Sequence, residues 1–437
     1  MKTLFVSILG LTVAFWTWPA QGEQVATYTI EDAIRIGLER SIPLREARRN
    51  VEIAHEQVRD VRAQVYPSLD VNANYTRIGD LPEFPGSGPV GTKDTYAANV
   101  EAGQLLYSGG AVKAALRIAS DFIEASDAER ARVESDLVRR ITRDFYAVLF
   151  FEQARDVAQA SVAQLEAFEK QSRLRYEAQA LAEFDWLSAR VALANERPNL
   201  IEAENRLAVA KRAFRDLIYL DDDAFELEGD LDIALPELDR ETLIQHGLAN
   251  RPELRAVEIA IIINDAERDV NRAENLPELR AFAQYGGSEP GQRDFLSDDW
   301  EWEWSAGLRA TWSLYDGGAR RARDRILRLE REQEEDQQSE LIRAVALEID
   351  VAWRNLEEAR ERLASTSEAV ALAKRALEIA TVRFDQGLAT YLDVTDSNLA
   401  LSRARLNRSS ALLDCRQSLA DLHFAAAWPA TQEKQEP

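Results

Sequence analysis

A six-residue phrase occurs twice in this chain and constrains its fold more than any other feature. Residues 106–111 read LYSGGA and residues 314–319 read LYDGGA, with the two tyrosines 208 positions apart (315 − 107). Each copy follows a segment of alternating apolar and polar residues and precedes a long charged segment with helical periodicity. Because paired glycines let the backbone bend without steric conflict, each copy is predicted to join a strand to a helix. The chain is therefore expected to contain two structural repeats.

Alternation of apolar and polar residues predicts the strands. In residues 68–76 and 95–103 every second residue is apolar, and a further strand is expected directly after Pro277. The alternation is longest from Trp300 to Leu314, where tryptophan, alanine or leucine occupies every even position. A period of two with one polar face is typical of a strand that has one wet side. Segments 79–93 and 286–299 are rich in glycine and proline and are predicted to be exposed loops.

Helical periodicity accounts for most of the remaining chain. In both repeats a short helix is interrupted near a proline and then resumes, over about 44–66 and 254–276, and stops at Pro67 or Pro277. The phrase is followed by helices predicted over 111–178 and 319–385, each about 100 Å long at ~1.5 Å per residue. Returning helices over 183–219 and 390–427 complete two long αα-hairpins. Pro198 is expected to kink the first returning helix.

These patterns set the predicted domain boundaries. A signal peptide over 1–22 is indicated by Lys2, an apolar run from Leu4 to Trp16, and small residues before Glu23, so the mature protein is expected to be exported. The first repeat then occupies 23–220, an equatorial linker 221–240, the second repeat 241–428 and a C-terminal tail 429–437. The linker is predicted to be a small patch of mixed structure.

Composition disfavours several classes of function. The formal charge of −23 argues against nucleic-acid partners and fits a surface or lumen that attracts cations, although a merely solvated acidic surface explains it equally well. His55, His246 and His423 lack metal-ligand spacing, and no phosphate-binding glycine loop or nucleophile elbow occurs. We therefore expect no enzyme activity, no cofactor and no metal site. Cys415, the sole cysteine, is expected to be buried.

Strands of this kind cannot remain alone in lipid, because their edge groups would find no hydrogen-bond partner there. A strand from Trp300 to Trp312 rises about 41 Å. Tilted by roughly 45°, it covers about 29 Å of bilayer and places tryptophans near both interfaces. The sequence thus favours strands that close with those of other chains around a polar interior. A soluble β-sandwich is the alternative, and helices of ~100 Å between the strand pairs disfavour it.

The segment Arg383-Phe384-Asp385-Gln386-Gly387-Leu388-Ala389-Thr390-Tyr391-Leu392-Asp393-Val394-Thr395-Asp396-Ser397 resembles the periplasmic helix-turn-helix tip of TolC-like outer-membrane efflux proteins. The resemblance covers essentially the whole mature chain. It implies a mixed α and β membrane protein: a homotrimer with a twelve-stranded transmembrane β-barrel, four strands per chain, continuous with a twelve-helix periplasmic α-barrel and a small equatorial region. The first repeat offers a weaker counterpart over 175–188, with Gln179 at the position of Gly387.

The resemblance also implies a function and a location. Such a protein is a passive conduit in the outer membrane, reaching into the periplasm, for tripartite efflux or type I secretion. Its partners are outer-membrane lipid, a periplasmic adaptor and, through the adaptor, an inner-membrane pump. A non-channel periplasmic coiled-coil scaffold is the alternative, but it leaves the tryptophan-bearing strands unexplained. The sequence does not identify the cargo, the adaptor or the pump.

The resemblance also assigns roles to individual residues of this chain by their position in the family's pattern. The resemblance places Asp393, Asp396 and Asp185 in an acidic ring at the tunnel entrance, whose carboxylates would attract cations and raise some carboxyl pKa values; helix capping is the alternative for each. Phe384 and Ala389 replace the family's tyrosine and arginine, so closure is expected to rely on Phe384 and Trp186. The expected adaptor-contacting residues are Gly387, Leu388, Ala389, Thr390, Gln179, Ala180 and Leu181. The expected strand–helix junctions are Tyr107, Gly109, Gly110, Tyr315, Gly317 and Gly318, and the expected membrane aromatic belt is Trp300, Trp302, Trp304 and Trp312.

Overall fold

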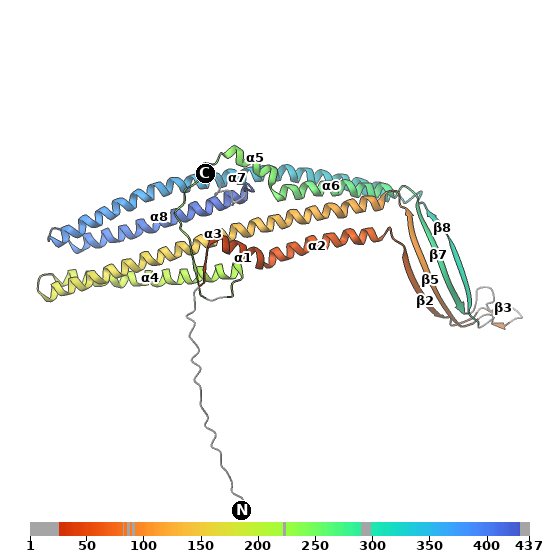
Figure 1. Cartoon of the computed structure of the whole chain (residues 1–437), viewed down its shortest axis with the longest axis horizontal. Coiled ribbons are helices and arrows are strands. Elements are labelled where there is room, and N and C mark those ends of the chain that lie inside the picture. The colour runs from red at the N-terminus through yellow and green to blue at the C-terminus, as the bar shows by residue number, and fades with distance from the viewer. Residues whose placement is uncertain are drawn as a thin grey trace, which may run out of the picture.

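A computed structural model describes residues 26–81, 83–84, 88–89, 92–221, 224–289 and 299–428 of the chain. The predicted signal peptide and C-terminal tail lie outside these residues. The molecule is elongated, with two long helical hairpins at one end, a sheet at the other and shorter helices between them (Figure 1). Within the described residues, no helix is both long enough and apolar enough to cross a membrane.

The sheet at one end contains four antiparallel strands in the order β2-β5-β7-β8. Its members are β2 (Ser68–Arg77), β5 (Asp94–Tyr107), β7 (Glu278–Glu289) and β8 (Glu301–Thr311). Each repeat contributes two neighbouring strands, and β5 and β7 join the repeats at the centre. Among the described residues, β2 and β8 are the strands at the edges of this sheet.

Both segments predicted as loops contain strand residues. Residues 286–289 belong to β7 and not to a loop. A Cβ on Gly286 would lie 2.5 Å from Asn99 Cβ and 2.7 Å from Ala98 O, so glycine there permits close approach of β5. In the other predicted loop, the short strands β3 (Glu83–Phe84) and β4 (Gly88–Pro89) form a hairpin.

The helices of the two repeats correspond one to one. The first repeat contains α1 (Ile30–Arg40), α2 (Ile42–Ala63), α3 (Ala111–Glu177) and α4 (Glu183–Ile218). The second contains α5 (Arg240–Asn250), α6 (Pro252–Ala273), α7 (Ala319–Asp385) and α8 (Tyr391–Ala425). The long helices confirm the predicted bounds to within two residues. Pro198 lies inside α4, which remains one helical segment.

The repeat extends to individual side-chain contacts. Gly37 on α1 lies against Ile141 on α3, where an added Cβ would come within 2.3 Å of the isoleucine Cδ1. Gly247 on α5 lies in the same way against Ile349 on α7, at 2.5 Å. Both glycines therefore allow a short helix to pack closely on a long one. Positions in the short helices differ by 210 between repeats (247 − 37), and those in the long helices by 208 (349 − 141).

Two apolar cores lie at mid-length, one in each repeat. The first packs Ile141 and Phe145 of α3 against Phe214 and Ile218 of α4. The second packs Ile349 and Leu356 of α7 against Leu422 of α8. Cys415 is fully buried on α8, which confirms the prediction for it.

The equatorial linker adds a small parallel sheet to the first core. Strand β6 (Phe225–Leu227) pairs with β1 (Ala26–Tyr28), a strand that the sequence did not predict. Phe225 and Leu227 of β6 are buried and join the core cluster of α3 and α4. Through this sheet the start of the first repeat is hydrogen-bonded to the equatorial linker.

Candidate functional site

The tip of the second hairpin is built from two helix-capping motifs. Gly387 has a φ of 73°, and the N–H groups of Gly387 and Leu388 donate to the carbonyls of Phe384 (3.0 Å) and Arg383 (2.8 Å), which is a Schellman motif. Thr390 Oγ1 then accepts from Asp393 N at 3.3 Å while Asp393 Oδ2 accepts from Thr390 N at 2.7 Å. This capping box begins α8 directly after the turn.

Asp393 is thus a structural residue within its own chain. The hydroxyl of Thr390, at 2.7 Å, and its backbone N–H hold the pKa of this carboxyl below its usual value. The capping alternative is therefore confirmed for Asp393, while its place in a pore ring stays a prediction. Asp396, one turn further along α8, is exposed.

The first tip repeats the turn without the same residues. Gln179 has a φ of 57°, and the N–H groups of Gln179 and Ala180 donate to the carbonyls of Tyr176 and Arg175, both at 2.8 Å. The backbone therefore forms the same Schellman motif with a non-glycine residue in the left-handed region. Ala182 is the N-cap of α4 and has no side-chain oxygen, so Asp185 lies in the first turn without a capping box.

Phe384 joins the two hairpins inside one chain. Its side chain is buried with Ala189 of α4 and Tyr391 and Val394 of α8. The ring centroid of Phe168 on α3 lies 6.1 Å away, and the Arg175 guanidinium carbon lies 5.0 Å above the Phe384 ring. Loss of this ring would open a cavity between the hairpins.

Trp186 has different partners. Its ring stacks on Tyr176 at a centroid distance of 5.2 Å, and its Nε1 donates to Glu169 Oε1 at 2.9 Å. Both partners lie on α3, so Trp186 holds the first hairpin together. The expected joint role of Phe384 and Trp186 in closure therefore stays a prediction about the assembled protein.

Three large apolar side chains are exposed at the tips. Phe184 is 76% exposed, Leu388 65% and Leu392 63%. Phe184 and Leu392 occupy equivalent positions in the first turns of α4 and α8 (392 − 184 = 208), and neither was among the predicted adaptor-contacting residues. The sequence feature that could have predicted them is an apolar residue at the same position after each turn, on the face of the helix that α3 or α7 does not cover. The remaining predicted tip residues, Ala180, Leu181, Ala389 and Thr390, lie in the same two turns.

The strand–helix junctions confirm the predicted glycine geometry. Gly109 and Gly110 have φ values of 63° and 95°, and Gly317 and Gly318 have values of 70° and 94°. A side chain at Gly109 would meet Ala273 O at 2.7 Å and Leu276 Cβ at 2.9 Å, whereas nothing lies within 4 Å at Gly317. Tyr107 is exposed at the end of β5, and Tyr315 is exposed four residues beyond the end of β8.

A polar cluster reinforces the second junction. Asp316 Oδ2 accepts from the backbone N–H of Arg320 at 2.8 Å, and Asp316 Oδ1 accepts from Gly318 N at 3.0 Å. These bonds to the start of α7 lower the pKa of Asp316 to about 2. The Arg320 guanidinium in turn donates to the carbonyls of Glu274 and Ser313. The cluster therefore connects the end of α6, the segment that follows β8 and the first turn of α7.

The predicted tryptophans lie on one face of the sheet and at both of its ends. Trp302 stacks with Tyr285 at 5.5 Å and with Trp300 at 5.7 Å. Trp304 is 76% exposed on the same face. At the opposite end, Trp312 Nε1 donates to Asn275 O at 3.0 Å, near the helices. The arrangement fits aromatic side chains at two membrane interfaces.

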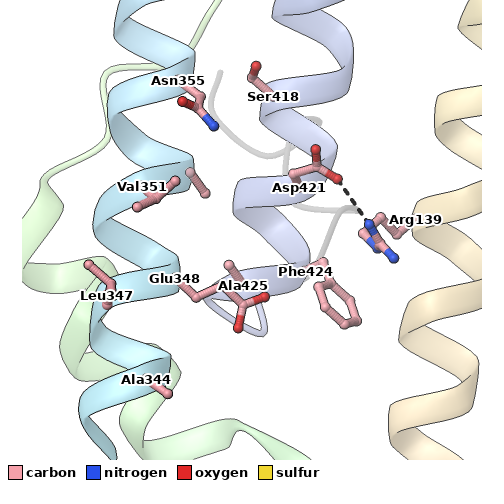
Figure 2. Close-up of a pocket in the computed structure, with 11 residues that line it drawn as sticks. Arg139, Ala344, Leu347, Glu348, Val351, Asn355, Ser418, Asp421, Phe424 and Ala425 are labelled. Carbon is pink, nitrogen blue, oxygen red and sulfur yellow. Dashed lines mark hydrogen bonds and ion pairs between the residues drawn. The ribbon is translucent and has the colours of Figure 1, made fainter.

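The two repeats are also joined at mid-length by charged side chains. Arg139 of α3 binds Asp421 of α8 at 3.4 Å (Figure 2), and Arg143 of α3 binds the same carboxylate. Phe424 lies beside them, with the guanidinium carbons of Arg139 and Arg251 at 4.7 and 5.2 Å from its ring centroid. A cavity of 450 Å³ lies beside this joint, between α3, α7 and α8. Among the described residues, no group of side chains could hold a metal ion.

The family profile of the outer membrane efflux proteins matches residues 33–218 and 243–427. No curated protein sequence matches the chain. The structure of CusC is similar, with a TM-score of 0.77, 16% identity and coverage of 91% of both chains. The Campylobacter jejuni CmeC outer membrane channel is similar with a TM-score of 0.76, 14% identity and coverage of 98% and 94%. The Neisseria gonorrhoeae MtrE outer membrane channel, solved in an open state, has a TM-score of 0.73, 22% identity and coverage of 91% and 88%.

Proposed function

Because the chain belongs to the outer membrane efflux protein family, whose profile spans both repeats, we propose that three copies form one continuous conduit through the outer membrane and across the periplasm. Each copy supplies four strands to a closed twelve-stranded barrel and its long helices to an α-barrel. The conduit is passive, and substrate enters at the helical tips and leaves through the strands. Like the other members of this family, the chain acts in the outer membrane.

The sheet carries this proposal. It has an apolar, tryptophan-bearing face and a polar face, and among the described residues the outer edges of β2 and β8 are unpaired. In lipid each backbone N–H or C=O group without a hydrogen-bond partner costs roughly several kcal/mol, so the edge strands must pair. Four strands are too few to close around an aqueous interior, whereas twelve suffice. Closure between copies satisfies both requirements at once, and the scaffold alternative satisfies neither.

The tips are proposed to contact a periplasmic adaptor and, through it, an inner-membrane pump. Phe184, Leu388 and Leu392 expose large apolar surfaces at the turns of the two helical hairpins. These turns lie at the end of the molecule farthest from the sheet (Figure 1). Isolated apolar side chains on a helical tip can anchor a partner when they enter its pockets. At the second tip, Gly387 and Thr390 fix the turn that carries Leu388 and Leu392 through the two capping motifs.

An introduced cysteine tests the adaptor contact. In a Cys415→Ala background, Leu388→Cys should crosslink to a periplasmic protein in intact cells. Leu372→Cys is a matched control, because Leu372 is equally exposed at 65% but lies further back on α7. If both cysteines capture the partner equally, or if neither does, the tip is not the site that contacts the adaptor.

Acidic residues at the tips are proposed to favour cations at the entrance. Asp396, Asp393 and Asp185 occur once per chain and would be present three times in the assembly. Asp396 is the best candidate, because it is exposed and Asp393 already binds Thr390. Repeated carboxylates at a constriction raise the local cation concentration.

Planar-bilayer recording tests the conduit and this entrance together. The detergent-extracted protein should run as a heat-sensitive trimer and give cation-selective current steps. Asp396→Asn should lower the preference for cations, whereas Asp216→Asn, an exposed acid at the far end of α4, should leave it unchanged. If the protein is soluble without detergent and gives no current steps, the channel proposal is wrong.

A further inference from the structure

We propose that neighbouring chains contact each other through surfaces equivalent to those by which the two repeats contact each other within one chain. In this arrangement β8 of one subunit lies beside β2 of the next, and Ala310 lies directly opposite Ala73. This inference rests on the proposed oligomeric conduit and adds to it a strand register and specific contacts. Its partner is a second copy of this chain. It follows from the residue-by-residue equivalence of the repeats.

The strand pairs within the two repeats have the same register. In the first repeat Ser68 of β2 lies opposite Gly103 of β5. In the second Glu278 of β7 lies opposite Thr311 of β8. The first strands therefore differ by 210 residues (278 − 68) and the second strands by 208 (311 − 103), as do the helices that follow them. No register shift separates the two repeats.

The pairing between repeats can therefore be transferred to the free edges. Within the chain, Ala102 of β5 lies opposite Ala283 of β7. The equivalent of Ala102 is Ala310 on β8, and the equivalent of Ala283 is Ala73 on β2. Every residue of β2 is exposed, and all residues of β8 except Glu301 and Gly307 are exposed, whereas β5 and β7 are largely covered by their neighbours. The two edges have the exposure expected of strands that lack a partner.

The faces of the two edge strands agree with this register. It places Leu308 opposite Tyr75 and Trp312 opposite Val71, so apolar residues meet on the tryptophan-bearing face. On the other face, it places Arg309 opposite Asn74 and Thr311 opposite Asn72. A slip of one residue would set every apolar side chain of one strand against a polar one of the other.

The helices beside the sheet provide an independent observation. Within the chain, Arg255 of α6 binds Glu124 of α3 at 2.6 Å. The equivalent of Arg255 is Arg45 on α2, and the equivalent of Glu124 is Glu332 on α7. Both residues are exposed in the single chain. The opposite charges are thus repeated at the two surfaces that the proposal brings together.

Further along the helices, the residues at the proposed contact between chains differ in chemistry from the equivalent residues at the contact within the chain. The positions equivalent to Arg139 and Arg143 on α3 are Leu347 and Val351 on α7, which are 63% and 47% exposed. Both side chains also line the cavity between α3, α7 and α8 (Figure 2). The position equivalent to Gln417, a partner of Arg143, is Val209 on α4, which is 60% exposed. The contact between chains is therefore apolar where the contact within the chain is charged, which accounts for these exposed side chains.

Cysteine pairs test the register. In a Cys415→Ala background, the pair Ala310→Cys and Ala73→Cys should form disulfides between subunits upon oxidation, giving a covalent trimer on non-reducing gels that reductant converts to monomer. Directly opposite residues lie about 4.5–5.5 Å apart between Cα atoms, within the range that a disulfide spans. The in-chain reference, Ala102→Cys with Ala283→Cys, should crosslink to a similar extent without leaving the monomer band.

Same-face controls make the test specific. Ala310→Cys paired with Val71→Cys or Tyr75→Cys places the sulfurs two residues off register, at a Cα separation of about 7–8 Å, and should crosslink severalfold less. Preferential crosslinking of either control would overturn the register while the trimer stands. The register also fails if no pair crosslinks in a protein that still runs as a heat-sensitive trimer. A monomer in detergent before oxidation would instead overturn the proposed conduit itself.

Charge reversal tests the helical contact separately. Glu332→Arg and Arg45→Glu should each lower the temperature at which the trimer dissociates, because each places like charges together. The double variant should recover most of that loss, as expected for two groups in direct contact. Additive losses in the double variant would show that the two residues do not meet.

Discussion

At the scale of single residues, the two tips contain the same backbone turn with different side chains. Gly387 and Gln179 both occupy the left-handed region directly after a long helix. Glycine adopts this region freely, whereas a residue with a Cβ is strained there by about 1–2 kcal/mol. The first tip is therefore the less stable of the two.

Exchanging these residues should change the local stability of the tips in opposite directions. Gly387→Ala should destabilise the second turn by about 1 kcal/mol, since no atom within 4 Å would clash with the new Cβ and only the backbone strain remains. Gln179→Gly should stabilise the first turn by a similar amount. Amide hydrogen exchange at both turns measures the change; faster exchange in Gln179→Gly would contradict this assignment of strain.

His423 should contribute to the pH dependence of stability. It lies in the last turn of α8, where burial lowers its pKa from the ordinary value of 6.5. The unfolded chain therefore binds a proton more readily than the folded chain as the pH falls below 6.5, and stability decreases. His423→Gln should flatten the fall in the thermal midpoint between about pH 7.5 and pH 5.5.

A matched variant separates this effect from that of other groups. His55 is exposed on α2, so His55→Gln should keep the wild-type pH dependence. If both substitutions flatten the profile equally, burial of His423 is not the cause.

At the scale of elements, the lengths of the long helices were predictable because their ends are encoded locally. The Gly-Gly pairs precede α3 and α7, and Gly387 follows the end of α7. Strand ends were less predictable, since glycine inside β7 permits close approach to β5 and resembles a loop signal in the sequence. The end of β8 also differs from the expected one, at Thr311 instead of Leu314, because its partner strand β7 begins at Glu278, directly opposite Thr311.

Capping should control fraying of the two returning helices. Thr390→Ala removes the capping box of α8 and should cost about 1 kcal/mol. Ala182→Thr places a hydroxyl three residues before Asp185 and should create the missing box of α4, with a gain of similar size.

Hydrogen exchange in the first turn of each helix measures both effects. Ala182→Ser is a second variant with the same hydroxyl and should also slow exchange in α4. Unchanged exchange in both α4 variants would show that Asp185 cannot complete the box.

At the scale of the whole molecule, the two faces of the sheet should tolerate charge differently. Leu308 lies near the middle of β8 on the tryptophan-bearing face, and Leu308→Lys should cost about 2–4 kcal/mol in a bilayer. Ser305, on the polar face, should accept lysine without loss of assembly. The yield of heat-sensitive trimer in outer-membrane fractions measures the difference; equal yields would contradict the proposed orientation of the sheet.

The repeat, the helix lengths, the alternation of the strands and the glycines at the bends are encoded locally, because each depends on neighbours a few residues away. The contacts between residues far apart in the chain came from the fold, such as Phe384 between two hairpins and Gly286 against Asn99. Side-chain contacts of this kind depend on which helices and strands pack together, and periodicity does not specify that. The duplicated phrase showed that two repeats exist, and the fold showed where they join. That join, through β5 and β7, is the basis for the proposed contact between chains.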